Sequence, residues 1–189
     1  MRWSGAVLAG GQSSRFGRDK ARYPYRGKPL LQWVLEGLRA ADERFIVAGR
    51  DYAEFGVPVY GDLLPGGGSL SGLHAALAHA QTDWVAVAAC DQPFLGADYW
   101  SYLLGQLREG YVAVVPSFGE AIEPLGAVYH KGLQDLVSQQ LRAGNFGLQA
   151  LLKPLPVLRL PAEELAQRFG ARLFTNLNVP EDRANLGEP

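Results

Sequence analysis

The sequence contains almost no cysteine and no long hydrophobic run. Its 189 residues include one cysteine, Cys90, so no internal disulfide bond can form, which favours a reducing compartment. No apolar stretch approaches the roughly 20 residues that a membrane span needs. The short apolar stretch at residues 5–9 leads into a glycine loop, where a signal peptide would have its cleavage site. We therefore expect a cytoplasmic protein that does not associate with membranes.

An excess of charge of either sign is also lacking. The 18 Lys and Arg residues nearly balance the 19 Asp and Glu residues, for a formal net charge of -1. Such a chain lacks the broad basic surface that binds polyanions, so we expect no nucleic-acid partner, although a local basic site is compatible with this composition. No repeat, low-complexity segment or change of composition marks a linker. We predict a single domain over residues 1–189.

Short apolar runs alternate with amphipathic segments along the chain. The apolar runs predict strands at residues 6–9, 45–48, 57–60, 84–89, 112–115, 124–129 and 157–160. Helical spacing predicts helices at residues 30–38, 70–77, 99–109, 132–142, 146–152 and 162–168. Pro58 indicates a strand start or an edge, and Pro116 is expected to end its strand. The alternation predicts an α/β fold, a Rossmann-like three-layer sandwich with a mainly parallel central sheet.

A glycine-rich loop follows the first predicted strand. Residues 10–20 read GGQSSRFGRDK. Glycines let the backbone approach an anion closely, and successive N–H groups can then point at phosphate oxygens. Arg15, Arg18 and Lys20 add positive charge to this loop. We interpret it as a phosphate-binding loop; a plain tight turn with solvated charges is the alternative.

Two common nucleotide motifs do not match this loop. The P-loop motif fails because Arg18 and Asp19 follow Gly17, where lysine and serine or threonine belong. The dinucleotide motif G-x-G-x-x-G fails because Gln12 stands at its second glycine. The sequence therefore supports neither a P-loop NTPase nor a dinucleotide-binding oxidoreductase.

An aspartate follows the most apolar predicted strand. Asp91 comes just after the run at residues 84–89. Open parallel sheets bind ligands at the carboxyl ends of their strands, so Asp91 and Gly10 are expected at the same edge. A carboxylate beside a triphosphate is suited to Mg²⁺, which is commonly held by one or two carboxylates plus phosphate oxygens. The alternative is a turn or helix-capping aspartate; together with the glycine loop, we favour the metal role.

Five motifs together resemble the molybdenum cofactor guanylyltransferases, the MobA type of nucleotidyltransferase. They read LAGGQSSRFGRDK at 8–20, GSLSGL at 68–73, CDQPFL at 90–95, EPLGAVY at 123–129 and NLNVPED at 176–182. They follow one another in family order over nearly the whole chain. The first motif alone indicates only the wider nucleotidyltransferase superfamily, whereas the ordered set is much more specific.

The resemblance implies a reaction and its substrates. GMP would pass from GTP to the terminal phosphate of molybdopterin carrying molybdenum (Mo-molybdopterin), giving a guanine dinucleotide cofactor and pyrophosphate. Mg²⁺ is the implied metal, and molybdenum-insertion proteins and apo-molybdoenzymes are the implied protein partners. Because the acceptor is already an anionic phosphate, no serine, cysteine or histidine nucleophile is required. Catalysis can consist of positioning and charge neutralisation at the α-phosphate.

The resemblance also assigns residues to roles. Catalysis would involve Lys20 and Arg15, which contact phosphates, and Asp91, the Mg²⁺ ligand. Binding of the nucleotide and the acceptor would involve Leu8, Ala9, Gly10, Gly11, Lys20, Asp62, Gly68, Ser69, Gly72, Asn176 and Asn178. In this set the first loop contacts guanine and ribose, the loop at 68–72 closes over the base, and the two asparagines match the molybdopterin side. Ser69 stands where the family usually has proline, which predicts a more flexible loop.

Other assignments are also compatible with these motifs. A cytidylyltransferase for the same cofactor is the first alternative, although related cytidylyl enzymes tend to carry Ala-Gly where this chain has Gly10-Gly11. A sugar-1-phosphate nucleotidylyltransferase and a non-catalytic molybdopterin carrier are the others. Glu123, held extended by Pro124, either lies near the acceptor, as the resemblance suggests, or is a rim carboxylate. We assign no chemistry to Cys90, which is expected to be buried.

Overall fold

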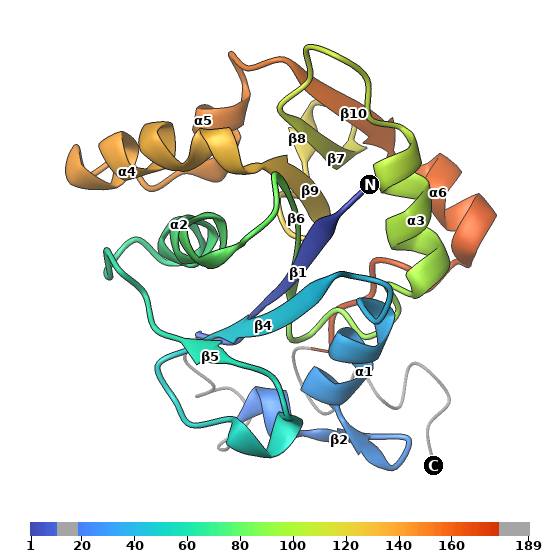
Figure 1. Cartoon of the computed structure of the whole chain (residues 1–189). Coiled ribbons are helices and arrows are strands. Elements are labelled where there is room, and N and C mark those ends of the chain that lie inside the picture. Colours follow the sequence, from blue (N-terminus) through green and yellow to red (C-terminus); the bar gives the residue numbers. More distant parts are fainter. Residues whose placement is uncertain (11–18, 178–189) are drawn as a thin grey trace.

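A computed structural model describes residues 1–10 and 19–177 of the chain. Its main feature is an eight-stranded sheet in the order β10-β7-β9-β6-β1-β4-β5, with β8 paired to β7 (Figure 1). The strands are β1 (Trp3–Leu8), β4 (Glu43–Val47), β5 (Val59–Tyr60), β6 (Trp84–Ala89), β7 (Ala113–Phe118), β8 (Ala121–Ile122), β9 (Ala127–His130) and β10 (Val157–Pro161). A separate hairpin joins β2 (Pro24–Tyr25) to β3 (Lys28–Pro29).

Most strand pairs in the large sheet are parallel. β5, β4, β1 and β6 run in one direction, and β7 is parallel to β10. β9 is antiparallel to both of its neighbours, β6 and β7, and β8 is antiparallel to β7. The prediction of a mainly parallel sheet is confirmed. β5, which follows Pro58, lies at the edge that this proline indicated.

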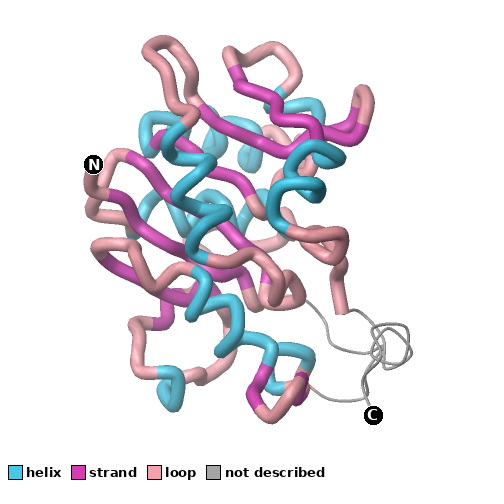
Figure 2. The backbone as a smooth tube through the Cα atoms, turned by 90° about the vertical axis from the view of Figure 1, so that its right-hand side faces the viewer, coloured by secondary structure: helices cyan, strands magenta, loops and turns pink. Residues whose placement is uncertain are grey.

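Helices cover both faces of the sheet and so make three layers. One face carries α1 (Leu30–Gly37), α3 (Ala97–Gly105) and α6 (Ala162–Phe169), and the other carries α2 (Ser69–His79), α4 (Gln134–Arg142) and α5 (Leu148–Leu152). Figure 2 looks onto the first face, with its helices in front of the strands. The short 3-10 helices are η2 (Lys20–Arg22), η3 (Ala53–Phe55) and η4 (Lys131–Leu133). The predicted three-layer sandwich is confirmed.

β1 and β6 form the centre of the sheet and bring two motifs together. They pair from Trp3 opposite Trp84 to Leu8 opposite Ala89. Neighbouring side chains of β1 enter different hydrophobic clusters, one beneath α1 and α3 and the other beneath α2. Burial on both faces explains why these segments are apolar throughout. Because the two strands end opposite each other, the glycine loop and the Asp91 turn leave the sheet at the same edge.

The structure corrects several predicted boundaries. β1 begins at Trp3, three residues before the predicted start, and β9 begins at Ala127, three residues after the predicted start. The sequence predicts that Pro116 ends its strand, but β7 continues to Phe118. β9 pairs with β7 only as far as Val114, and β8 pairs from Ser117 onward, so on that side Pro116 lies between the two ladders. A proline, which has no N–H, is tolerated at such a gap. Helix α3 is also shorter at its end than predicted, because it ends at Gly105.

No helix within residues 1–10 and 19–177 is long and apolar enough to cross a membrane.

Candidate active site

A cavity of about 650 Å³ opens at the carboxyl ends of the central strands. This volume falls within the usual range for small-molecule sites, roughly 300–1,000 Å³. Ten of the residues predicted to form the site line the cavity: Leu8, Ala9, Gly10, Lys20, Asp62, Gly68, Ser69, Gly72, Asp91 and Asn176. Gly11, Arg15 and Asn178, which the sequence also predicts for the site, lie outside the described residues.

Lys20 and Asp91 belong to different motifs and meet in this cavity. Lys20 opens η2, Asp91 follows β6, and Lys20 Nζ lies 3.2 Å from Asp91 Oδ2. Their side chains remain 23% and 13% exposed, so an ion placed there would be largely shielded from bulk water. The Leu177 N–H also donates to the Asp91 carbonyl oxygen at 3.2 Å, which brings the neighbouring Asn176 to this part of the cavity.

Gln92 fixes the turn that presents Asp91. Its Oε1 accepts from the Ala89 N–H at 2.8 Å, and its Nε2 donates to the Leu125 carbonyl oxygen at 3.1 Å. Gln92 is buried, so these bonds are protected from water and tie the end of β6 to the segment before β9. Sequence reasoning missed this residue, because it occupies the variable position of the C-D-x-P-F-L pattern.

Glycines form the opposite wall of the cavity. Gly66 and Gly68 adopt φ of +98° and +60°, a backbone region that other residues rarely enter. Ser71 Oγ accepts from the Gly67 N–H at 2.9 Å and donates to the Leu64 carbonyl oxygen at 2.5 Å. These two bonds hold the loop against the first turn of α2. The greater flexibility that Ser69 predicts for this loop stays a prediction.

Asp62 lies beside this glycine wall, after the edge strand β5. Burial raises the pKa of its carboxyl group, and the nearby His74 partly offsets that effect. The predicted nucleotide-side carboxylate is thus at the same end of the cavity as the loop predicted to cover the base.

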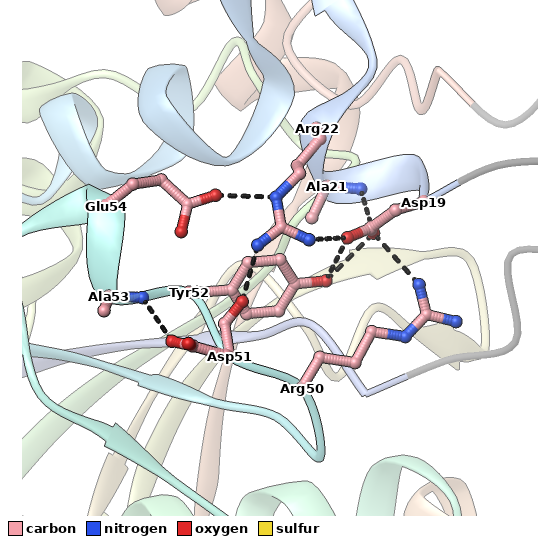
Figure 3. Close-up of polar contacts among 8 residues, drawn as sticks. All are labelled: Asp19, Ala21, Arg22, Arg50, Asp51, Tyr52, Ala53 and Glu54. Atoms are coloured by element: carbon pink, nitrogen blue, oxygen red, sulfur yellow. Dashed lines mark hydrogen bonds and ion pairs between the residues drawn. The ribbon is translucent and has the colours of Figure 1, made fainter.

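A network of polar contacts around Asp19 positions Lys20 (Figure 3). Asp19 precedes η2, and its Oδ1 accepts from the Ala21 N–H at 3.1 Å, as an N-cap does. The Tyr52 hydroxyl lies 2.8 Å from Oδ2, and Arg22 Nη1 donates to the same oxygen at 2.9 Å. Arg50 Nη1 lies 3.6 Å from Oδ1. Asp19 therefore ties the start of η2, which carries Lys20, to the segment at 50–52 that follows β4.

The far side of this network is anchored at the surface. Arg22 Nε donates to Glu54 Oε1 at 2.6 Å, and Arg22 Nη2 donates to the Asp51 carbonyl oxygen at 2.5 Å. Tyr52 itself is fully buried, and burial together with Asp19 raises the pKa of its hydroxyl. The hydroxyl therefore stays protonated and acts as a donor to Asp19.

Tyr52→Phe is expected to lower the free energy of unfolding by about 2 kcal/mol, because a buried hydrogen bond to a carboxylate is lost without creating a hole. In a chain of this length that corresponds to a fall in Tm of roughly 6 °C. Thermal unfolding followed by circular dichroism measures it. Glu54→Gln, at the exposed edge of the same network, serves as the control and is expected to leave Tm unchanged. Equal Tm values for both variants would contradict a central role for Tyr52.

Cys90 lies in the cavity wall next to Asp91 but is not set up for chemistry. Burial, with the neighbouring Asp91 charge, raises the pKa of its thiol to about 12. The thiol is therefore protonated at neutral pH, and protonated thiols are poor nucleophiles and metal ligands. This agrees with assigning it no catalytic part.

Comparison with known proteins decides the family. The model of the MobA-like NTP transferase domain matches residues 5–163. The chain belongs to this family. It is 42% identical over 186 residues to a protein of Deinococcus radiodurans named "Probable molybdenum cofactor guanylyltransferase", covering 96% of this chain and 92% of the relative. It is 35% identical over 188 residues to the "Molybdenum cofactor guanylyltransferase" of Yersinia pseudotuberculosis, with 95% and 92% covered.

Solved structures agree with this membership of the MobA-like family. The fold matches the crystal structure of molybdopterin-guanine dinucleotide biosynthesis protein A from Archaeoglobus fulgidus with a TM-score of 0.82 and 30% identity, over 96% of this chain and 95% of that one. The recognition made from the five motifs is thereby confirmed, and the chain is a nucleotidyltransferase. Nucleotidyltransferases of this family commonly use a divalent metal.

The donor atoms in the cavity suit a hard divalent cation. Asp91 offers a largely buried carboxylate, and within residues 1–10 and 19–177 no group of three His, Cys, Asp or Glu side chains could form a complete metal site. Mg²⁺ is usually held in this way, by one or two carboxylates together with substrate phosphates and water. The residues present therefore fit Mg²⁺ shared between the protein and a phosphate ligand.

Proposed function

We propose that this chain transfers GMP from GTP to the terminal phosphate of Mo-molybdopterin, forming molybdopterin guanine dinucleotide and releasing pyrophosphate. One observation carries the proposal: the described parts of five motifs, far apart in sequence, line a single cavity with Lys20 and Asp91 in contact inside it. The names of the relatives agree with this reaction. The cytoplasm is the proposed location, and molybdenum-insertion proteins and apo-molybdoenzymes are the proposed partners.

The walls of the cavity suggest where each substrate binds. Leu8, Ala9 and Gly10 face the glycine loop at 66–72, and these small groups suit the flat surface of guanine and its ribose. Lys20 and Asp91 suit the phosphates. Asn176 and Glu123 also line the cavity near Asp91, and we assign them to the acceptor. A nucleotide placed this way would direct its α-phosphate towards the acceptor phosphate.

Gly10 favours guanine over cytosine at the base end. Among residues 1–10 and 19–177, a Cβ atom at this position would meet no atom within 4 Å, and Gly10 itself lines the cavity. An alanine, as the related cytidylyl enzymes tend to carry, would therefore take its space from the ligand. The glycine leaves that space for the larger purine.

Asp91 is the residue that would hold Mg²⁺, together with phosphate oxygens of GTP. Bound there, the metal would neutralise charge on the triphosphate and help pyrophosphate to leave. Asp91 presents its carboxylate from a turn fixed by Gln92, so the ligand is positioned before substrate arrives. This preorganisation lowers the cost of ordering the site during the reaction.

Lys20 carries the chemistry that the chain itself supplies. Its ammonium group would contact the phosphates and stabilise the negative charge that accumulates around the α-phosphorus. An oxygen of the acceptor phosphate forms the new P–O bond, and the bond between the α-phosphorus and the bridging oxygen breaks. The electron pair of that bond leaves with pyrophosphate. No proton has to be removed from the nucleophile, so the cavity requires no general base.

The test is transfer of label from α-³²P-GTP or α-³²P-CTP to purified Mo-molybdopterin in the presence of Mg²⁺, with pyrophosphate release measured in parallel. We expect labelled dinucleotide and equimolar pyrophosphate with GTP, at a rate at least about tenfold above that with CTP. Gly10→Ala is the matched variant and should reduce the ratio of the transfer rate with GTP to the rate with CTP. Faster transfer from CTP would identify a cytidylyltransferase, and acceptor binding without pyrophosphate release would identify a carrier.

A further inference from the structure

The glycine wall of the cavity packs from behind against α4. Gly66 and Gly68 line the cavity, whereas Gly67 is buried between them. A Cβ atom on Gly67 would lie 2.4 Å from Leu141 Cδ2 and 3.2 Å from Phe146 Cδ1. On Gly66 or Gly68 it would meet none of the described residues within 4 Å, apart from the neighbours in the chain. The loop therefore has one face towards the ligand space and the other against two side chains from α4 and the turn after it.

The cap that ends α4 fixes the position of Phe146. The Gly144 N–H donates to the Leu141 carbonyl oxygen at 3.1 Å, and the Asn145 N–H donates to the Gln140 carbonyl oxygen at 2.9 Å. These are the two bonds of a Schellman motif, and Gly144 has the positive φ, +76°, that this motif requires. Phe146 follows the motif directly, so the cap sets where its side chain leaves the backbone.

α4 itself is firmly attached to the fold. It packs beside α2 on the same face of the sheet (Figure 1). Its buried residues Val137 and Leu141 belong to the hydrophobic cluster beneath α2. The support behind Gly67 is therefore part of the core, and only the ring of Phe146, which is 48% exposed, reaches the surface.

The start of α2 is fixed from the opposite side. A Cβ atom on Gly72 would lie 2.8 Å from Leu8 Cδ1, so the first turn of α2 packs closely on the end of β1. The Gly72 N–H donates to the Gly68 carbonyl oxygen at 3.2 Å. Residues 66–68 lie before this anchored turn, and α4 and its cap supply the packing on their outer face.

The sequence of this loop makes outside support valuable. Gly66, Gly67 and Gly68 are consecutive, and glycine leaves the backbone more freedom than any other residue. Ser69, where the family usually has proline, does not restrict the backbone as that ring would. A loop of this kind loses conformational entropy when a ligand orders it, unless packing has ordered it beforehand.

We propose that Phe146 is a positioning residue for the nucleotide. It acts through Gly67: its ring packs on the outer face of the loop and holds the wall in place before the base binds. This role lies outside the five motifs, and it supplies part of the stiffness that proline would give at position 69. The inference rests on the proposed function, because that function assigns the base to this wall.

The first experiment measures nucleotide binding without turnover, by calorimetry with GTP and Mg²⁺ and no acceptor. We expect Phe146→Ala to weaken GTP binding by about tenfold, because the loop must then be ordered by the ligand. Phe146→Leu keeps an apolar side chain against Gly67 and should retain most of the affinity. Phe118→Ala is the matched control: Phe118 ends β7, is 51% exposed, and its loss should leave GTP affinity unchanged.

A second substitution tests whether the effect passes through the loop. Ser69 is the first residue of α2, a position that accepts proline. Adding Ser69→Pro to Phe146→Ala should therefore restrict the loop and restore most of the GTP affinity. In steady-state transfer, Phe146→Ala should raise KM for GTP by about tenfold and leave kcat and the KM for the acceptor unchanged. A loss of folded protein would instead lower the apparent kcat.

The outcomes separate this inference from the proposed function. Equal GTP affinity in the wild type and Phe146→Ala overturns the inference, as does an equal loss in Phe118→Ala. A double variant that binds GTP no better than Phe146→Ala also overturns it, because the effect would then not pass through the loop. If the protein transfers no GMP, or prefers CTP, while Phe146→Ala still weakens nucleotide binding and Ser69→Pro restores it, the inference stands and only the proposed reaction falls.

Discussion

Asp91→Asn is expected to lower the rate of GMP transfer by about a hundredfold or more. The substitution keeps the size of the side chain, and the backbone contact from Leu177 to residue 91 does not depend on the carboxylate. It removes the charge that lies 3.2 Å from Lys20 Nζ and that would hold Mg²⁺ against the phosphates. Steady-state pyrophosphate release at saturating GTP and acceptor measures the effect.

Two further variants make this result interpretable. Asp135→Asn removes an exposed carboxylate from the first turn of α4, away from the cavity, and should keep full activity. Lys20→Met should lose activity to a similar extent as Asp91→Asn. The double variant should lose less than the product of the two single effects, because the residues act together on the same phosphates. More than a tenth of wild-type activity in Asp91→Asn would contradict the role assigned to this carboxylate.

Gly37→Ala is expected to have the largest effect on stability. A Cβ atom on Gly37 would lie 2.0 Å from the carbonyl oxygen of Leu95, so either α1 or the backbone before α3 must move. Overpacking against a fixed backbone costs about 3 kcal/mol or more. For a chain of this size the expected fall in Tm is roughly 10 °C, measured by calorimetry. Because Leu95 lies on the turn after Asp91, activity should fall as well.

Gly105→Ala is the matched control for this effect. Gly105 is the last residue of α3, as Gly37 is of α1, but a Cβ atom there would meet none of the residues that the structure describes within 4 Å. Alanine has less conformational freedom than glycine in the unfolded chain and favours the helix. The free energy of unfolding of this variant should therefore be unchanged or raised by roughly 0.5 kcal/mol. If both variants had the Tm of the wild type, the conclusion that α1 packs closely on the Leu95 turn would be wrong.

The centre of the fold could be predicted because local pattern and tertiary environment agree there. The apolar runs that became β1 and β6 are buried on both faces, and the turns after them carry the residues of the site. Gly10 and Asp91 could be placed at one edge from the rule for parallel strands alone. The position of Pro116 could not be predicted in the same way. It lies between the residues of β7 that pair with β9 and those that pair with β8, and the local sequence does not determine which strands pair.

The surroundings of the site could not be predicted from the sequence, because they depend on contacts between segments that are far apart in the chain. Tyr52 and Arg50 reach Asp19 from the chain that follows β4, a region with no periodic pattern. The sequence indicated Glu123 through its motif, but its place in the cavity wall and its bond to the Leu125 N–H required the structure.

A crystal structure with Mg²⁺ and a GTP analogue carrying a methylene bridge between the α- and β-phosphates would test the central claim most directly. We expect guanine between Gly10 and the loop at 66–72, with the α-phosphate between Lys20 and a metal ion on Asp91. Triphosphate beside Glu123 and Asn176, or nucleotide away from this cavity, would contradict it.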